Sequence, residues 1–283
     1  ITGANSHISK VLISRLEDSL FEITCISRQE LNWIHQGIKL IIGDLLEEET
    51  ISQIPNQDIV IHIAGVTHAK YYNEYYKGNV ETTINLVKYF DKLNIKHFIF
   101  LSTRCAVKNS GSYGLTKLES EKIIINSGLP FTILRLSEVL GYNLSSYNFL
   151  KSMAIFFPFV FIPNTNKINL NPILETDLID ILIKIIFSEK STQKIYTISG
   201  DENFSLKEIM NIVPGLMKGK RIFISLPIII FKIIAYCNLI LKKPYFFPDQ
   251  IDRLICKKSS NISMIKNDFN FFPRSVKRFL NNM

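Results

Sequence analysis

The order of short apolar runs is the feature that most constrains how this chain can fold. Such runs cover 22–27, 39–42, 58–63, 97–101 and 131–134, and they alternate with segments of helical periodicity at 10–16, 79–93 and 113–126. Ile1-Thr2 has the character of the end of one more strand, which leads into a turn over 3–9. Strands that are apolar along their whole length are buried on both faces, as in parallel sheets covered by helices. The pattern therefore predicts an α/β fold, a doubly wound parallel sheet of the Rossmann type.

Length and composition agree with one large globular unit. The chain has 283 residues, of which 47% are hydrophobic and 20% charged, which excludes a disordered or collagen-like chain. A chain of this length buries enough surface to fold without disulfides or metal ions. Its four cysteines lack the spacing of a metal site, so we expect free thiols, no bound metal and a cytoplasmic location. The first residues show no signal peptide, and we expect that the strand residues usual before such a turn are missing.

The sequence divides into a neutral part and a basic part. Residues 1–200 carry 19 Lys and Arg against 19 Asp and Glu, whereas residues 201–283 carry 14 against 6. We predict a dinucleotide-binding domain over 1–141, to which 168–200 returns, and a smaller C-terminal substrate-binding part over 142–167 and 201–283. The charge of the smaller part suggests an anionic ligand or surface, or only a solvated basic face. We expect no nucleic-acid partner, and a homodimer stays open.

One apolar stretch, Ile222–Leu241, has the length of a membrane span. It contains Pro227 and Lys232, and a lysine near the bilayer centre costs about 3 kcal/mol. A helix that begins near Pro227, and is either buried or lies on the inner face of a membrane, is therefore the better prediction. Basic residues precede and follow the stretch, as in helices that bind anionic membrane surfaces: Lys218, Lys220, Arg221, Lys242 and Lys243.

Ligands of doubly wound sheets bind at the carboxyl ends of the strands, so the residues at those ends are the functional candidates. The first turn has Gly3, Ser6 and Ser9 in the places of a G-x-x-G-x-x-G phosphate loop, and a serine hydroxyl can donate to a phosphate. Arg28 ends the second strand with no carboxylate beside it, which favours NADP, unless Arg28 is an ordinary surface residue. Asp44 either accepts a hydrogen bond from adenine or caps a helix.

The strongest chemical signal follows the run at 97–101. Ser102 and Thr103 end this strand, and Tyr113 and Lys117 lie on one face at the start of the next predicted helix. A lysine ammonium beside a phenol lowers the pKa of the phenol, so that the tyrosine can act as an acid or base near neutral pH. A hydroxyl at the strand end can hold the same substrate oxygen. The arrangement predicts proton transfer by Tyr113.

The chain resembles the extended short-chain dehydrogenase/reductase superfamily, in particular the NAD-dependent epimerase/dehydratase group, which acts largely on nucleotide sugars. The resemblance runs over nearly the whole chain. It rests on stretches in a fixed order: ITGANSHIS, IIGDL, VIHIAG, YYKGNVETT, FIFLST, YGLTKLESEK, LPFTILRLSEVLG, ILETDLIDIL and YTISGDENFSLKEI. It implies NAD or NADP as the cofactor.

The resemblance also implies roles for individual residues. The cofactor-binding residues would be Gly3, Ser6, His7, Ile8, Arg28, Asp44, Leu45, Ala64, Gly65, Asn79 and Lys117. The catalytic residues would be Thr103, Tyr113 and Lys117. The substrate would contact Ser102, Thr103 and Arg135, of which the last begins an R-x-x-x-V-x-G stretch that ends at Gly141.

Three features depart from the family pattern. Ser6 and Ser9 replace two glycines of the phosphate loop, which bears on the affinity for the cofactor. Thr103 and Tyr113 are separated by 10 positions, fewer than in most epimerases and dehydratases, which suggests a different substrate shape. Arg104 stands where the dehydratases of this group have an acid, which disfavours dehydration.

We therefore expect an NAD(P)-dependent sugar epimerase or ketoreductase that acts on a nucleotide-linked or lipid-diphosphate-linked sugar. Tyr113 would remove the hydroxyl proton while hydride moves to the nicotinamide, and the basic C-terminal part would bind the diphosphate. The alternative from another class is a non-catalytic dinucleotide-binding sensor or assembly module. The incomplete glycine loop favours that alternative, and the set of Thr103, Tyr113 and Lys117 opposes it.

Overall fold

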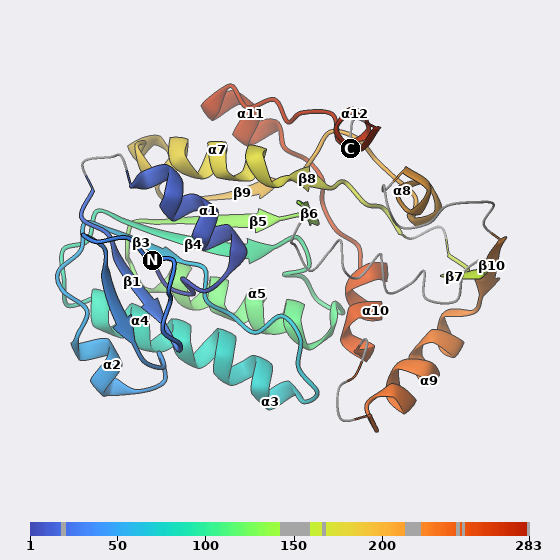
Figure 1. Ribbon diagram of the computed structural model, residues 1–283, viewed down its shortest axis with the longest axis horizontal. Helices are drawn as coiled ribbons and strands as arrows, with labels where there is room; N and C mark the ends of the chain where they lie inside the picture. The colour runs from blue at the N-terminus through green and yellow to red at the C-terminus, as the bar shows by residue number, and fades with distance from the viewer. Residues whose placement is uncertain are drawn as a thin grey trace.

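The computed structural model describes residues 1–17, 21–141, 159–165, 168–212, 222–241, 244 and 247–281, and every structural statement below concerns these residues (Figure 1). The strands are β1 Thr24–Ser27, β2 Lys39–Ile42, β3 Ile59–His62, β4 His97–Thr103, β5 Phe131–Leu136, β6 Val139–Leu140, β7 Phe159–Pro163, β8 Ile173–Leu174, β9 Lys194–Ile198 and β10 Ile222–Leu226. The α-helices are α1 His7–Leu16, α2 Glu48–Ser52, α3 Tyr72–Tyr75, α4 Thr82–Phe90, α5 Gly111–Asn126, α7 Glu175–Ile186, α8 Leu206–Ile212, α9 Ile228–Asn238, α10 Pro248–Ile255, α11 Ser263–Phe269 and α12 Val276–Asn281. A π-helical segment, Tyr76–Glu81, joins α3 to α4, and a short 3-10 helix, Glu189–Ser191, precedes β9.

The central sheet is parallel throughout. Four strands in the order β3-β4-β5-β9 form one half, and the pair β1-β2 forms the other half. Thr2 joins the halves, because it forms parallel bridges to Ile26 of β1 and to His62 of β3. The prediction that Ile1-Thr2 ends a strand is therefore confirmed. The sheet extends from Thr2 in both directions, so a topological switch point lies at the turn that follows.

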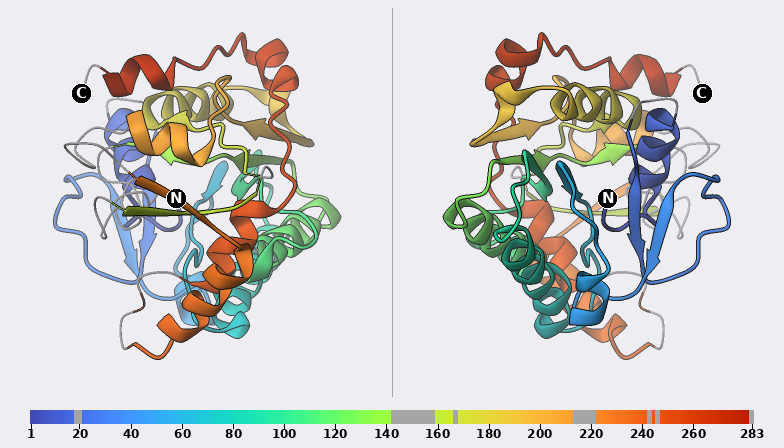
Figure 2. Two further views of the ribbon diagram at one scale, coloured as in Figure 1. Left: turned by 90° about the vertical axis from the view of Figure 1, so that its right-hand side faces the viewer. Right: turned by 90° about the vertical axis from the view of Figure 1, so that its left-hand side faces the viewer.

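Each face of the sheet packs on its own hydrophobic core. In β4, Ile99 and Leu101 lie in the core that contains α1 and α7. Phe98 and Phe100 of the same strand lie in the opposite core, which contains α4 and α5. All residues of β4 are buried, which explains why the sequence of this strand is apolar without alternation. The helices lie in layers on both sides of the sheet (Figure 2), so the predicted doubly wound α/β fold is confirmed.

All three predicted helices differ from their predicted bounds, and α5 begins at Gly111 rather than at residue 113. Helix α1 begins at His7 rather than at residue 10, because the Ser6 side chain caps it by accepting the N–H of Ser9. The helix predicted over 79–93 is π-helical at first and becomes α-helical at Thr82. There the Thr83 hydroxyl donates to the Asn79 carbonyl at 2.6 Å. Such π-helical segments are frequent at functional sites.

A smaller part with its own core lies beyond the carboxyl ends of the strands, at the right of Figure 1. Its core joins β7, α8 and α12 through residues such as Val160, Met210 and Val276. The parallel pair β7-β10 completes this part. Helix α11 and the residues just after it, however, pack on the sheet domain, where Ile265 and Phe271 lie in the core beside α7.

The apolar stretch over 222–241 consists of two elements. Its first five residues form β10, which pairs with β7, and Pro227 is the N-cap residue of α9. The helix predicted to begin near Pro227 is present. Within the described ranges, no helix combines the length and the apolar character that crossing a bilayer requires. The basic residues that flank the stretch, Lys218, Lys220, Arg221, Lys242 and Lys243, lie outside the described residues.

Candidate active site

Two adjoining cavities lie at the carboxyl edge of the sheet. The larger cavity has a volume of about 550 Å³ and is lined by the turn after Thr2 and by the residues that follow β1, β2 and β3. The smaller cavity has a volume of about 330 Å³ and is lined by the ends of β4 and β5, the start of α5, and α10. His68 lines both cavities, so they meet there.

The turn that begins at Gly3 is locked by its own serines. Gly3 has φ +68°, and a Cβ at this position would lie 2.7 Å from the backbone of Ala64, so only glycine fits. The Ser9 hydroxyl donates to the Gly3 carbonyl at 2.8 Å and lies 2.7 Å from the Ser6 hydroxyl. The idea that both serine hydroxyls replace glycines as phosphate donors is therefore wrong for Ser9, which is buried and holds the turn closed.

Most of the predicted cofactor residues meet at the larger cavity. Those that line it are Gly3, Ser6, Arg28, Asp44, Leu45, Ala64 and Gly65. Both alternatives for Asp44 have support, because Asp44 lines the cavity and its carboxylate also accepts the N–H of Leu46 at 3.0 Å. The first turn of α1 adds backbone N–H groups and the positive end of a helix dipole. This donor set fits a dinucleotide.

Three predicted cofactor residues have other roles in the structure. The imidazole of His7 lies 2.8 Å from the Glu175 carboxylate and does not line the larger cavity. Ile8 lines the smaller cavity instead. Asn79 is buried, and its side-chain amide bonds the backbone N–H and carbonyl of Val66 and the hydroxyl of Thr116. Asn79 thus fixes the loop after β3 and has no free amide group to offer a ligand.

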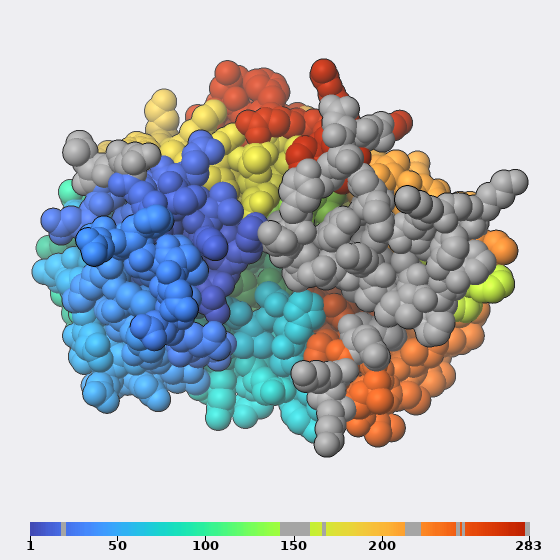
Figure 3. Space-filling view, in the orientation of Figure 1, coloured from blue at the N-terminus to red at the C-terminus, as the bar shows by residue number. Residues whose placement is uncertain are grey.

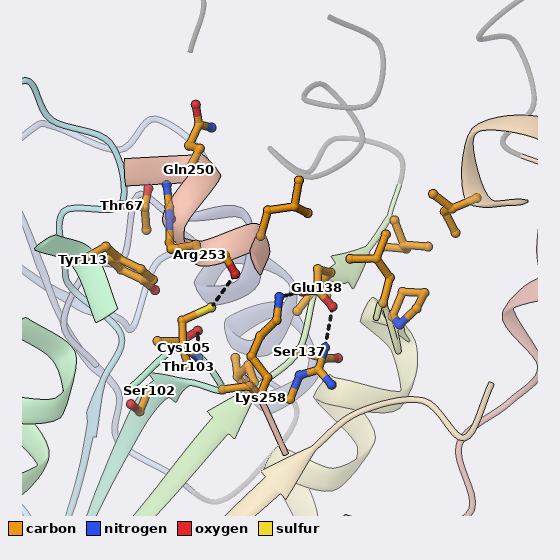
Figure 4. A pocket seen from close by; sticks show the side chains of 18 of the residues that line it. Thr67, Ser102, Thr103, Cys105, Tyr113, Ser137, Glu138, Gln250, Arg253 and Lys258 are labelled. Carbon is orange, nitrogen blue, oxygen red and sulfur yellow. Dashed lines mark hydrogen bonds and ion pairs between the residues drawn. The ribbon is translucent and has the colours of Figure 1, made fainter. Parts of the chain in front are cut away.

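Thr103 and Tyr113 line the smaller cavity together (Figure 4). Thr103 is the last residue of β4, and its hydroxyl oxygen accepts the N–H of Cys105 at 3.1 Å, which leaves its proton to be donated. Helix α5 approaches the loop after β4 very closely at Gly114, where a Cβ would lie 2.1 Å from the Cys105 carbonyl. Glycine at this position therefore brings the start of α5, and Tyr113 with it, to the end of β4.

Lys117 lies on α5 as Tyr113 does, and its predicted action on the phenol stays a prediction. Its ammonium lies 3.9 Å from the centre of the Phe100 ring, in a buried position near Gly65, and it lines neither cavity. Burial lowers the pKa of Lys117 to about 7, against the opposite effect of Glu121. Burial raises the pKa of Tyr113 to about 12, and the cation that opposes this rise is Arg253 rather than Lys117.

The Arg135 guanidinium, which was predicted to contact the substrate, is paired with Glu121 in the structure. Its Nε and Nη2 atoms bind the two oxygens of Glu121 at 3.0 and 2.5 Å, and Arg135 lines neither cavity. Ser102 does line the smaller cavity, but its hydroxyl donates to the same carboxylate at 2.5 Å. Glu121 is 1% exposed, so these contacts neutralise a buried charge under the site.

An ionic cluster that the sequence analysis missed lines the smaller cavity. Glu138 accepts from Arg104 at 2.7 Å and from Lys258 at 3.2 Å, and Figure 4 shows these contacts around the labelled Glu138 and Lys258. These two cations hold the pKa of Glu138 below its usual value although burial opposes them. The sequence feature that could have identified Glu138 as a site residue is the R-x-x-x-V-x-G stretch in which it lies.

Two polar atoms of the smaller cavity are candidates for substrate contacts. The Ser137 hydroxyl and the Arg104 Nε are buried, and neither has a hydrogen-bond partner among the residues that the structure describes. Buried polar groups are normally bonded, so each is suited to a ligand's hydroxyl or carbonyl. Ser137 also belongs to the R-x-x-x-V-x-G stretch, where its position was visible in the sequence but its exposure to a cavity was not.

Comparison with known proteins assigns the chain to a family. Residues 1–159 match the NAD dependent epimerase/dehydratase family. The UDP-glucose 4-epimerase of Vibrio cholerae is 24% identical over 306 residues, which cover 96% of this chain and 90% of that protein. An uncharacterized membrane protein of Methanocaldococcus jannaschii is 29% identical over 167 residues, and this match covers 50% of the chain and 48% of that protein.

A solved structure extends the comparison to the whole fold. The structure of MoeE5 in complex with UDP-glucuronic acid and NAD superposes with a TM-score of 0.75 at 16% identity, over 99% of this chain and 95% of that one. The fold and the paired cavities define an α/β dinucleotide-binding protein. The chain belongs to the NAD dependent epimerase/dehydratase family, which confirms the predicted resemblance, enzyme class and nicotinamide cofactor.

Proposed function

We propose that the protein is an NAD-dependent epimerase or ketoreductase that moves hydride at a hydroxyl-bearing carbon of a nucleotide-diphosphate sugar. One observation carries the proposal: Thr103 and Tyr113 line a cavity that meets, at His68, the cavity formed by the glycine turn. A sugar in the smaller cavity would therefore lie next to the end of a dinucleotide held in the larger one. NAD, when bound, supplies the hydride acceptor.

The residues of the chain handle the proton and the orientation of the sugar. The Thr103 hydroxyl donates to the sugar oxygen, since its own oxygen is already an acceptor for Cys105. Tyr113 removes the proton from the same sugar hydroxyl as the carbon is oxidised. In an epimerase the resulting ketone would rotate in the site so that its other face is reduced, and Tyr113 would then give the proton back to the sugar oxygen.

The smaller cavity suits a sugar with an attached diphosphate. Lys258, from the basic C-terminal part, lines it and offers a cation to a phosphate. The Ser137 hydroxyl and the Arg104 Nε, which lack a hydrogen-bond partner in the described part of the chain, are available to the sugar. The nucleotide-linked substrate is supported by the relatives, which include a UDP-glucose 4-epimerase and a complex with UDP-glucuronic acid.

The test of this function is turnover with defined sugars. The purified protein is incubated with NAD and a panel of UDP-hexoses and UDP-uronic acids, and proton NMR follows the sugar. We expect conversion of at least one substrate to its epimer or keto form. Binding of NAD without conversion of any nucleotide-linked or lipid-linked sugar would support the sensor alternative instead.

Cofactor choice is a separate prediction that rests on Arg28. Arg28 is exposed at the rim of the larger cavity, beside Ser27, with no acidic residue next to it. We propose NAD as the working cofactor and expect NADP to bind at least as tightly, because hydrogen bonds from a guanidinium to a phosphate contribute about 1.5–3 kcal/mol. Arg28→Ala should weaken NADP about tenfold or more and leave NAD unchanged, as measured by calorimetric titration. Equal losses of affinity for NAD and NADP would exclude a contact between Arg28 and the additional phosphate of NADP.

We also propose that α9 docks on an anionic membrane surface at the inner face of the membrane. Ile229, Ile233 and Tyr236 form one face of α9, and each is more than half exposed. Figure 3 shows the orange surface of this region at the end of the molecule away from the blue N-terminal residues. The sequence has basic residues before and after the stretch 222–241, and their positive charge is complementary to that of anionic lipid. Lys232 of α9 binds Asp252 of α10 at 2.7 Å, which ties α9 to the site.

Membrane docking predicts salt-sensitive co-sedimentation with anionic lipid vesicles. Ile233→Asp, on the exposed face of α9, should abolish it, while Ile125→Asp, on the exposed face of α5, should not. Protein that stays in the supernatant at low salt contradicts the proposal. So does a dimer in light scattering that Ile233→Asp dissociates, because a second copy would then cover α9.

A further inference from the structure

Helix α5, which carries Tyr113, is capped by a residue from another helix. Ser110 is its N-cap residue, but the Ser110 hydroxyl donates to the Val107 carbonyl instead of accepting from the helix. The Tyr113 N–H is bound by the Asp249 carboxylate of α10 at 2.9 Å. An acidic group at a helix N-terminus is stabilised by the helix dipole. The start of α5 is therefore held by α10, which follows in the sequence 136 residues later.

The fit between α10 and α5 depends on Gly111. This glycine has φ +81°, and a Cβ there would lie 2.5 Å from an oxygen of Asp249 and 3.2 Å from the Cβ of Asp252. No side chain can occupy that space while α10 keeps its position. The local sequence of α5 is thus adapted to the approach of α10, which makes the contact a built feature of the fold.

The same carboxylate forms an ion pair with a cation over the tyrosine ring. The Asp249 oxygen that does not cap α5 lies 2.8 Å from the Arg253 Nε, one turn further along α10. The Arg253 guanidinium carbon lies 4.7 Å from the centre of the Tyr113 ring. The Arg253 side chain is 16% exposed and the Asp249 side chain 8% exposed, so both charges are largely shielded from solvent. Figure 4 shows Arg253 beside Tyr113 at the cavity.

We propose that Arg253 is the positioning residue that stabilises the phenolate of Tyr113, and that Asp249 holds both the arginine and the tyrosine in place. The proposal rests on the function proposed above, since it assigns Tyr113 the proton transfer. It adds a cation from the C-terminal part to the one that the sequence pattern assigns to Lys117. Lys117 lies over the Phe100 ring, 3.9 Å from its centre.

The electrostatics of the site agree with this assignment. Burial is the largest influence on the pKa of Tyr113 and raises it. Of the surrounding charged groups, Arg253 lowers this pKa, whereas Cys105, Asp249 and Tyr75 raise it. Arginine stays charged at every accessible pH, so its influence on the phenol does not titrate away. Lys117, by contrast, has its pKa lowered to about 7 by burial.

The first test is the pH dependence of kcat in the holoenzyme with NAD. Arg253→Gln should move the rising limb of the profile to higher pH by about one unit or more, because it removes an opposite charge within a few ångströms of the phenol. At neutral pH kcat should fall about tenfold or more, with a smaller change in KM. Arg253→Lys should restore part of the pH shift and part of the loss in kcat. Arg15→Gln, which removes an exposed arginine paired with Asp180, is the matched control and should change neither.

A second variant keeps the test valid if Arg253→Gln fails to fold. Asp249→Asn retains an oxygen that can accept the Tyr113 N–H but removes a negative charge that raises the pKa of Tyr113. The loss of the ion pair with Arg253 raises the pKa of Tyr113, and the loss of the negative charge lowers it. If Asp249 holds Arg253 in place, the rising limb of Asp249→Asn should lie between those of the natural protein and Arg253→Gln. An unmoved limb in folded Arg253→Gln, or a limb of Asp249→Asn at lower pH than that of the natural protein, overturns the proposal, and a rise in KM alone would show that Arg253 serves only as a ligand for the substrate anion.

A readout without turnover separates this proposal from the proposed function. Tyrosine labelled with carbon-13 at the phenolic carbon gives one resonance that disappears in Tyr113→Phe and so belongs to Tyr113. With NAD bound, this resonance should begin to titrate at lower pH in the natural protein than in Arg253→Gln. Identical titrations overturn the role of Arg253 even if the enzyme is active. A difference without any turnover would support the Arg253 contact and count against the proposed reaction alone.

Discussion

Replacing Tyr113 with phenylalanine is expected to lower kcat by about 10²–10⁴-fold and to leave NAD binding close to that of the natural protein. The substitution removes only the phenolic oxygen, and the ring keeps its contacts with Tyr75 and with the Arg253 guanidinium. Tyr113 lines the smaller cavity rather than the larger one, so the residues that fit the dinucleotide are untouched. The effect should therefore fall on the proton-transfer step.

The measurement compares kcat, KM and the NAD dissociation constant for the two proteins. Tyr76→Phe is the matched control, because Tyr76 is another tyrosine of the same region that lines neither cavity. Unchanged kcat in Tyr113→Phe would contradict the assignment of the reaction to this site. A large loss of NAD binding in that variant would show that Tyr113 has a structural role.

The second large effect is expected on stability rather than on the reaction. Arg135→Met should lower the free energy of unfolding by about 3–5 kcal/mol, the range for removal of one partner from a buried ion pair. Arg135 neutralises Glu121, which is 1% exposed, through two charge-assisted hydrogen bonds. The variant leaves that carboxylate buried with the Ser102 hydroxyl as its remaining partner.

Urea denaturation of Arg135→Met, Glu121→Leu and the double variant measures the coupling. The double variant should recover part of the loss, because a buried ion pair replaced on both sides by apolar groups often costs little. If Arg135→Met unfolds at the same urea concentration as the natural protein but raises KM, then Arg135 is a substrate ligand after all.

The fold was largely predictable because its signals are local. Strands β1 and β4 are buried along their whole length and most of β5 is buried, so these strands are rich in apolar residues, and the turns between strands and helices contain the expected small and polar residues. The wrong bounds involve side-chain bonds to the backbone, such as the Ser6 cap of α1 and the bond from the Thr83 hydroxyl of α4 to the Asn79 carbonyl of the π-helical segment.

The site was predictable only in part, because its charges are paired over long distances in the sequence. The Y-x-x-x-K spacing placed Tyr113 and Lys117 on one face of α5, as predicted, but it could not show that the lysine lies over Phe100. Arg135 was expected from the sequence to face the substrate. Its pairing with Glu121 could not be foreseen, because that pairing depends on how α5 packs on β5. Arg253 and Asp249 carry no motif, and only the docking of α10 brings them to Tyr113.

The most direct measurement of the central claim is the absorbance of reduced nicotinamide after the NAD-bound protein is mixed rapidly with a UDP-sugar substrate. We predict that the natural protein forms reduced nicotinamide within a turnover, transiently in an epimerase and persistently when the ketone is released. Tyr113→Phe, loaded equally with NAD, should form it about 10²–10⁴-fold more slowly. Equal rates in the two proteins, or conversion of the sugar without any reduced nicotinamide, would contradict hydride transfer assisted by Tyr113.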